Sequence, residues 1–159
     1  GDVYKRQGEA CRIAGMEMGE ERARLQQLRD QLWQALAGLG AVTLNGHPER
    51  HWPGILNLSF TGIAAEALLA AVPDIALSTG SACTSANTEP SHVLRAMGCD
   101  ALRARGAIRF SLGRFTTAAE IDYTLQAITP AVERLRALSP FWMAGKATTV
   151  DPIAWAPPA

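Results

Sequence analysis

The chain has 159 residues, of which 48% are hydrophobic, and this is enough to build one packed core. Fifteen basic residues balance fifteen acidic ones, so no net charge favours binding to nucleic acid or to an anionic membrane. No apolar run is long enough to cross a bilayer, and residues 1–15 contain no signal-peptide core. The odd number of cysteines, Cys11, Cys83 and Cys99, favours free thiols in a reducing compartment. We therefore expect a cytoplasmic protein without nucleic-acid or membrane partners.

Residues 8–39 are predicted to form a long amphipathic helix. Apolar side chains recur there at three- and four-residue steps, with charged residues between them. These apolar residues are Ile13, Met16, Leu25, Leu28, Leu32 and Leu36. Gly38 and Gly40 are expected to end the helix. Residues 1–7 do not join the helical pattern, and we interpret them as a non-native leader.

Short strands and short helices are expected next. Leu56, Leu58 and Phe60 alternate with polar residues, which is typical of a strand with one buried face. Alternation and short apolar runs predict strands at residues 41–44, 55–60, 75–77 and 107–112. Helical turns are predicted at residues 64–71 and 91–97. Residues 78–90 are almost all small and polar, so we expect a loop there.

The last predicted helix begins at a T-x-x-E capping box made by Thr117 and Glu120. Its apolar stripe continues to Leu138, and Pro130 is expected to kink it, because proline removes one helix hydrogen bond. Residues 140–159 are expected to form an irregular tail. Two interpretations of the tail's aromatic residues stay open: they dock a partner protein, or they cover the domain's own core. These residues are Phe141, Trp142 and Trp155.

The predicted elements indicate an α+β fold. Residues 8–139 are expected to form one domain, in which a short, mainly antiparallel sheet packs against long helices on one face.

Cys83 is the first candidate for chemistry. It lies in the run STGSACTSAN, where no large apolar side chain is available to bury a thiol. Reactive thiols need access and polar surroundings, but many exposed cysteines do nothing, so composition leaves both interpretations open. Cys11 and Cys99 are interpreted as small packing residues.

Arg109 is the second candidate. It lies on the polar face of the strand predicted at residues 107–112, where a guanidinium could bind a carboxylate through two parallel hydrogen bonds. A solvated strand arginine is the plainer alternative. Two further hypotheses are a Cys-His hydrolase that uses Cys83 and a zinc site made by Cys83, His92 and Cys99. No C-x-x-C pair supports the zinc site.

Two segments carry a family resemblance. Residues 76–97 read ALSTGSACTSANTEPSHVLRAM, and residues 108–123 read IRFSLGRFTTAAEIDY. The first segment closely resembles the active-site loop and following helix of cysteine desulfurases of the IscS/NifS type. The second resembles the strand and helix that follow in these enzymes. The resemblance covers residues 8–155 and implies the small C-terminal domain of a fold-type I pyridoxal-phosphate enzyme.

The resemblance implies a role for each candidate residue. Cys83 is implied to take the sulfur of L-cysteine as a persulfide and leave L-alanine, and Arg109 is implied to bind the substrate carboxylate. The long loop implies sulfur delivery to an iron-sulfur scaffold protein and other acceptors, from a homodimer. No metal ligand is implied, apart from the Cys83 persulfide as a transient iron-sulfur ligand.

The resemblance also implies that pyridoxal phosphate is held by a large domain upstream. The only lysines, Lys5 and Lys146, match no cofactor-binding position. We therefore expect a C-terminal fragment that is inactive alone. The alternatives are a docking module for sulfur acceptors and the small domain of another fold-type I enzyme, such as an aminotransferase; the cysteine in STGSACTSA counts against the latter.

Overall fold

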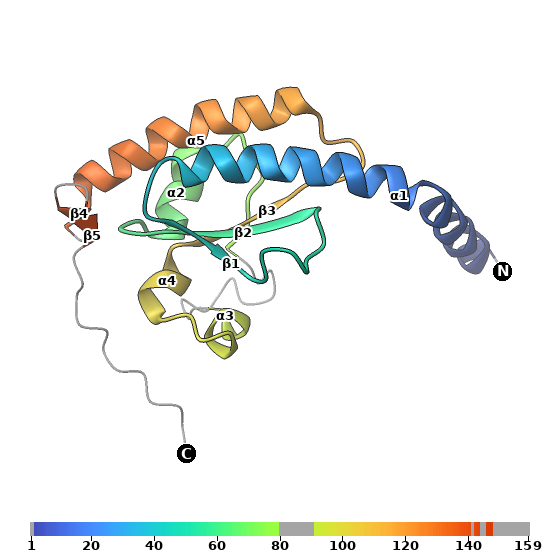
Figure 1. Cartoon of the computed structure of the whole chain (residues 1–159), viewed down its shortest axis with the longest axis horizontal. Helices are drawn as coiled ribbons and strands as arrows, with labels where there is room; N and C mark the ends of the chain where they lie inside the picture. The colour runs from blue at the N-terminus through green and yellow to red at the C-terminus, as the bar shows by residue number, and fades with distance from the viewer. Residues whose placement is uncertain (1, 80–90, 141, 144–145, 148–159) are drawn as a thin grey trace, which may run out of the picture.

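The computed structural model describes residues 2–79, 91–140, 142–143 and 146–147 (Figure 1). The elements, in chain order, are α1 (Asp2–Ala37), β1 (Val42–Asn45), β2 (Ile55–Phe60), α2 (Ala65–Ala71), α3 (His92–Ala96), α4 (Ala101–Arg105), β3 (Ala107–Ser111), α5 (Ala118–Leu138), β4 (Trp142–Met143) and β5 (Lys146–Ala147). Figure 1 shows α1 and α5 on one side of the central sheet and the short helices α3 and α4 on the other. The expected α+β class is confirmed.

The central sheet has the strand order β1-β2-β3, and both strand pairs are antiparallel. Its register places Leu44, Leu58 and Ile108 in one row across the three strands. The next row contains Asn45, Asn57 and Arg109. Successive side chains on a strand point to opposite faces, so the sheet has an apolar face and a polar face.

The main core lies between the apolar face and the two long helices. Leucines at three- and four-residue spacing on α1 and apolar residues of α5 meet the sheet there. The fully buried members include Leu25, Leu32, Leu36, Leu56, Leu58, Phe60, Ile108, Ile128 and Val132. Only the second half of α1 joins this core, because residues 2–20 are nearly all exposed.

At the end of α1, the chain reverses through Gly40 (φ 68°) and Ala41 (φ 46°), which both have left-handed backbone conformations. Arg136, a buried residue on α5, donates hydrogen bonds to the carbonyl oxygens of Leu39 (2.8 Å), Gly40 (2.7 Å) and Ala41 (3.2 Å). The ring of Trp142 lies 4.1 Å from the Arg136 guanidinium carbon. We call these contacts the Arg136 clamp. It holds the turn that follows α1 with a side chain from the last turn of α5.

Two expectations for the ends of the chain were wrong. The helix α1 begins at Asp2, so residues 2–7 belong to the same helix as the residues that follow, and their origin as a non-native leader stays a prediction. An exposed helical segment buries no face and therefore shows no apolar periodicity, although an i,i+4 ion pair between Asp2 and Arg6 supports it. In the tail, β4 and β5 form a short antiparallel hairpin where an irregular segment was expected. Trp142 covers its own domain, whereas Phe141 and Trp155 lie outside the described residues.

Two further differences lie on either side of residues 80–90. Residues 75–77 do not form a strand; only Ser78 pairs, through a single bridge to Arg109. Helix α4 was not predicted, and the side chain of Asp100 caps it by accepting a 2.8 Å hydrogen bond from the Arg103 amide. The Thr117 capping box is confirmed at the start of α5, and Pro130 lies inside this helix, which continues to Leu138.

Candidate active site

Arg109 is half-buried on the polar face of the sheet, at the middle of β3. Its backbone amide donates a 2.7 Å hydrogen bond to the carbonyl oxygen of Ser78, and the Ser78 amide donates a 3.3 Å bond back to the Arg109 carbonyl. This bridge fixes the first residue of the predicted loop beside the candidate carboxylate anchor. Cys83 follows Ser78 by five positions in the sequence and lies outside the described residues.

A hydrogen-bonded row of side chains extends from Arg103 across the polar face. The Nδ2 atom of Asn45 donates to Oδ1 of Asn57 and to Oγ of Ser59, each at 2.7 Å. The Oδ1 atom of Asn45 accepts a 2.8 Å bond from Nε of Arg103, whose Nη2 donates to the carbonyl oxygen of Leu44 at 3.0 Å. Sequence reasoning missed this row, because its members come from three distant segments. Asn57 is the register partner of Arg109, so the row reaches the strand position next to the candidate anchor.

The two described cysteines differ from one another. Cys99 is buried, as expected for a packing residue, and its thiol lies 3.8 Å from Oδ1 of Asn45. It forms a small second core with Leu94, Ala104 and Ala107 between the sheet and the pair α3–α4. The expectation of a packing role was wrong for Cys11, which is exposed on the N-terminal half of α1.

His47 and His51 stabilise a loop, and no histidine forms a metal site among the described residues. His47 and His51 have the H-x-x-x-H spacing, but Nδ1 of His47 accepts hydrogen bonds from the backbone amides of Glu49 (3.1 Å) and Arg50 (3.0 Å). Within the part of the chain that the structure describes, no three His, Cys, Asp or Glu side chains gather where they could hold a metal ion. The zinc hypothesis that includes Cys83 depends on a residue outside this part.

Among the described residues, the polar face that carries Arg109 contributes no lysine. Enzymes that use pyridoxal phosphate hold it through a lysine. Lys5 is exposed on the N-terminal half of α1, far from Arg109 in the sequence. Lys146 follows α5 in the two-residue strand β5. Neither lysine lies in the row that contains Arg109.

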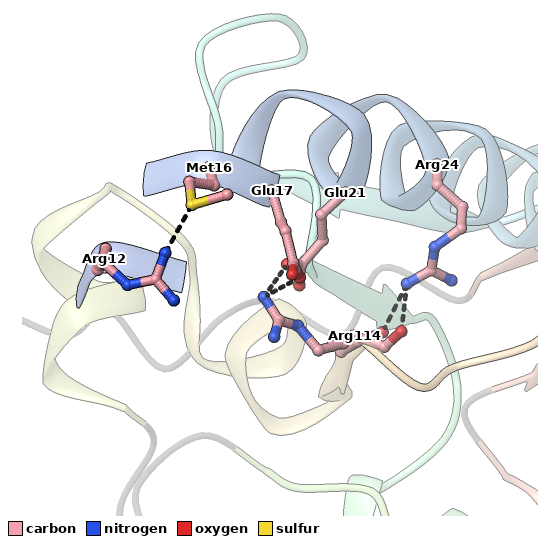
Figure 2. Close-up of polar contacts among 7 residues, drawn as sticks. Arg12, Met16, Glu17, Glu21, Arg24 and Arg114 are labelled. Atoms are coloured by element: carbon pink, nitrogen blue, oxygen red, sulfur yellow. Dashed lines mark hydrogen bonds and ion pairs between the residues drawn. The ribbon is translucent and has the colours of Figure 1, made fainter. Parts of the chain in front are cut away.

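Beyond β3, the chain is attached to α1 (Figure 2). Nη2 of Arg114 lies 2.9 Å from a carboxylate oxygen of Glu17 and 3.3 Å from one of Glu21. Arg24 donates 2.6 Å hydrogen bonds to the carbonyl oxygens of Thr116 and Arg114. These contacts fix the segment that follows the strand of Arg109 against the middle of α1.

Comparisons with known proteins agree with this geometry. The family model "Aminotransferase class-V" matches residues 7–124. The chain is 51% identical over 150 residues to "Cysteine desulfurase IscS" of Serratia proteamaculans and 47% identical to the protein of the same name from Colwellia psychrerythraea. These matches cover 94% of this chain and 37% of each relative.

Two solved structures share the fold. A "NIFS-LIKE PROTEIN" superposes with a TM-score of 0.66 at 31% identity, over 77% of this chain and 31% of that one. A NifS-like protein from Rickettsia africae gives the same TM-score at 20% identity, over 76% of this chain and 31% of that one, which supports the fold alone. Among the described residues, no helix combines the length and the hydropathy of a membrane span. The match to the family model over most of the sequence shows that this chain belongs to the class-V aminotransferase family, and its curated relatives are cysteine desulfurases.

Proposed function

We propose that this chain is the sulfur-accepting part of a cysteine desulfurase, which moves the sulfur of L-cysteine onto Cys83 and releases L-alanine. The observation that carries this proposal is the bridge between Ser78 and Arg109. It holds the segment that leads to Cys83 against the strand that carries a half-buried arginine. Five extended residues span at most about 18 Å, so the covalent chain keeps Cys83 near this arginine.

The proposed role of Arg109 is to bind the carboxylate of the substrate. Its guanidinium has a planar fork of donors that can make two parallel hydrogen bonds to a carboxylate. It lies on the polar face of the sheet, which also carries the hydrogen-bonded row that contains Arg103, Asn45 and Asn57. Binding the substrate there would bring its sulfur toward the segment that contains Cys83.

The proposed role of Cys83 is to accept the sulfur as a thiolate. Its sulfur forms a bond with the substrate sulfur, and the substrate C–S bond breaks with its electron pair on carbon. The carbon takes up a proton and becomes the methyl group of alanine, while Cys83 carries a persulfide. The carbon is reduced and the two sulfurs are oxidised, so no external oxidant is needed. The cofactor expected to weaken the C–S bond is pyridoxal phosphate, held by residues outside this chain.

The wider setting is part of the same proposal. The chain spans 37% of the length of the relatives named above, and no lysine lies beside Arg109 on the polar face of its described residues. We expect the chain alone to be inactive, and the complete enzyme to act as a cytoplasmic homodimer that passes sulfur to iron-sulfur scaffold proteins. During this transfer, the Cys83 persulfide is expected to bind iron-sulfur intermediates transiently. If the chain acts alone, a docking module for sulfur acceptors is the second candidate, because no lysine lies beside Arg109 among the described residues.

The test uses a complete, cofactor-loaded enzyme that contains this chain: the natural protein, or a hybrid that joins the chain to the preceding residues of the Serratia relative. Cys83→Ser should abolish alanine production, because a hydroxyl cannot accept sulfur or hold a persulfide. Cys11→Ser, at an exposed thiol on α1, is the matched control and should leave turnover unchanged. Mass spectrometry after exposure to cysteine should find one added sulfur on the peptide that contains Cys83. Normal alanine production by Cys83→Ser would contradict the proposal.

A further inference from the structure

Helices α3 and α4 connect residues 80–90 to the strand of Arg109, so their position sets where the chain leaves that segment. Each helix has only five residues. Helices this short are not stable in isolation, so tertiary contacts determine where they lie. One set of contacts is the small core of Leu94, Cys99, Ala104 and Ala107. The other is the pair of hydrogen bonds from Arg103 to Asn45 and to the Leu44 carbonyl.

The side chain of Asn45 is the centre of these contacts. It is buried, its oxygen accepts from Arg103 and lies near the Cys99 thiol, and its nitrogen donates to Asn57 and Ser59. An amide has one acceptor oxygen and two donor hydrogens, and all of them are used here. The amide can therefore adopt only one orientation in this network. Arg103 thus meets a fixed acceptor on the sheet, not an adaptable one.

The two flanks of residues 80–90 are consequently held on the same face of the sheet. The preceding flank is held at Ser78 by its bridge to Arg109. The following flank is α3–α4, which the hydrogen bond from Arg103 to Asn45 attaches to the sheet. Asn45 lies in the same register row as Asn57 and Arg109, next to the row of Leu44. The first attachment is made by backbone atoms. The second combines the small core with the half-buried side chain of Arg103, whose hydrogen bonds go to Asn45 and to the Leu44 carbonyl.

We infer that Arg103 is a positioning residue for sulfur transfer: acting through Asn45, it fixes α3–α4 on the polar face and so sets the geometry at the exit of residues 80–90. This inference rests on the proposed desulfurase function. It separates two roles on one sheet, because Arg109 is held by the Ser78 bridge and does not need Arg103. Loss of Arg103 should therefore slow the transfer step and leave cysteine binding largely intact.

The experiment measures alanine production by the complete, cofactor-loaded enzyme carrying Arg103→Ala, with Arg105→Ala as the matched control. Arg105 lies on the same helix and is exposed, so its loss removes the same charge without touching Asn45. Arg103→Ala should lower kcat about tenfold, because small displacements of reacting groups cost large factors in rate. The KM for cysteine should stay within about twofold, as expected when the loss falls on the reaction step.

Two further variants separate positioning from folding. Arg103→Lys keeps the charge but replaces the planar guanidinium with a single ammonium group. It should therefore fold and have a kcat between those of Arg103→Ala and the unmodified enzyme. The double variant Asn45→Ala/Arg103→Ala should be no slower than Asn45→Ala alone, because residues that act through one another are not additive. Additive losses would overturn the inference.

The outcomes also distinguish this inference from the proposed function. Equal kcat for Arg103→Ala and Arg105→Ala, in an enzyme whose Cys83→Ser variant is inactive, would overturn the positioning role and leave the desulfurase proposal standing. A raised KM with normal kcat would also overturn it, because Arg103 would then act on substrate binding. Absence of alanine from the unmodified complete enzyme would overturn both.

Discussion

The apolar and polar faces of the sheet β1-β2-β3 come from alternate residues of the same three strands. Leu44, Leu58 and Ile108 point into the core beneath α1 and α5. Their neighbours in the sequence, including Asn57 and Arg109, point to the other face, where α3 and α4 lie. The apolar face supplies most of the buried surface, whereas the polar face orients side chains through directed hydrogen bonds. Substitutions on the two faces should therefore affect different measurements.

The largest effect on stability is expected for Leu58→Ala on the apolar face. Leu58 is completely buried at the centre of the sheet, so truncation removes buried methyl groups and leaves a cavity. The free energy of unfolding should fall by about 4 kcal/mol. Ser111→Ala, at an exposed position at the end of β3, should change it by less than about 0.5 kcal/mol. Denaturant unfolding measures both, and similar losses would break the comparison between the faces.

The next effect is expected for Arg136→Lys, which tests a polar group on the side of the long helices. Burial lowers the pKa of the Arg136 guanidinium, and its donors are used by the Arg136 clamp. The single ammonium group of a lysine cannot replace both guanidinium nitrogens that bind these carbonyl oxygens, so some buried acceptors would lose their donors. We expect a loss of about 3 kcal/mol in unfolding free energy.

Arg134→Lys is the matched control for this substitution, because Arg134 is exposed on the same helix. It should be close to neutral in the same unfolding experiment. An unchanged free energy of unfolding in Arg136→Lys would show that the Arg136 clamp does not stabilise the layer of long helices.

A smaller effect is expected for Thr117→Ala at the start of α5. The Thr117 hydroxyl accepts a hydrogen bond from the Glu120 amide, and the Thr117 amide donates to the Glu120 carboxylate at 2.8 Å. Loss of the cap should cost about 1 kcal/mol in thermal or denaturant unfolding. A loss as large as that of Leu58→Ala would mean that the helix start, and not the apolar face, limits stability.

The capping box also predicts a pH dependence. Hydrogen bonds from the Thr117 backbone and hydroxyl lower the pKa of Glu120 below its ordinary value of 4.5. A lowered carboxyl pKa stabilises the fold above that ordinary value, and the stabilisation is lost as the pH falls through the lower folded-state pKa. Glu120→Gln should therefore flatten the acid side of the stability profile. An unchanged acid profile would contradict this assignment.

The smallest effect is expected for Arg114→Ala. Its ion pairs with Glu17 and Glu21 are partly exposed, and pairs of this kind contribute little because water and salt screen them. Unfolding free energy should fall by less than about 0.5 kcal/mol, and added salt should reduce the difference further. A loss that persists in high salt would indicate that the segment after β3 depends on this contact.

Much of the fold could be predicted because regular burial leaves a regular pattern. The bounds of β2 were predicted correctly, since strict alternation from Leu56 to Phe60 reflects one buried face. The start of α5 followed from the capping box. The start of α1 could not be found in this way, because residues 2–7 bury nothing. Residues 75–77 were predicted as a strand, but Ile75 and Leu77 pack against the core without pairing. A run of three apolar residues does not distinguish a buried strand from a buried segment that pairs with no strand.

The candidate site was predictable only where it follows strand alternation. That pattern placed Arg109 on the polar face, as the structure has it. The contact between Arg103 and Asn45 joins residues 58 positions apart, and the strand predicted at residues 41–44 stops before Asn45. Such a contact depends on the packing of α4, a helix whose one sequence signal was the capping residue Asp100. The role of Cys83 stays a prediction from the resemblance.

The Arg136 clamp has a consequence for the order in which the protein folds during synthesis. The carbonyls that it binds in the turn after α1 are separated from Arg136 by 95 to 97 positions. A ribosome therefore releases α1 and all three strands of the central sheet before the residue that holds the turn after α1 appears. Contacts between distant parts of a chain form late, and unfinished layers expose apolar surface. A nascent chain that stalls before α5 should consequently be a substrate for chaperones, and release of its last helical turn should end that dependence.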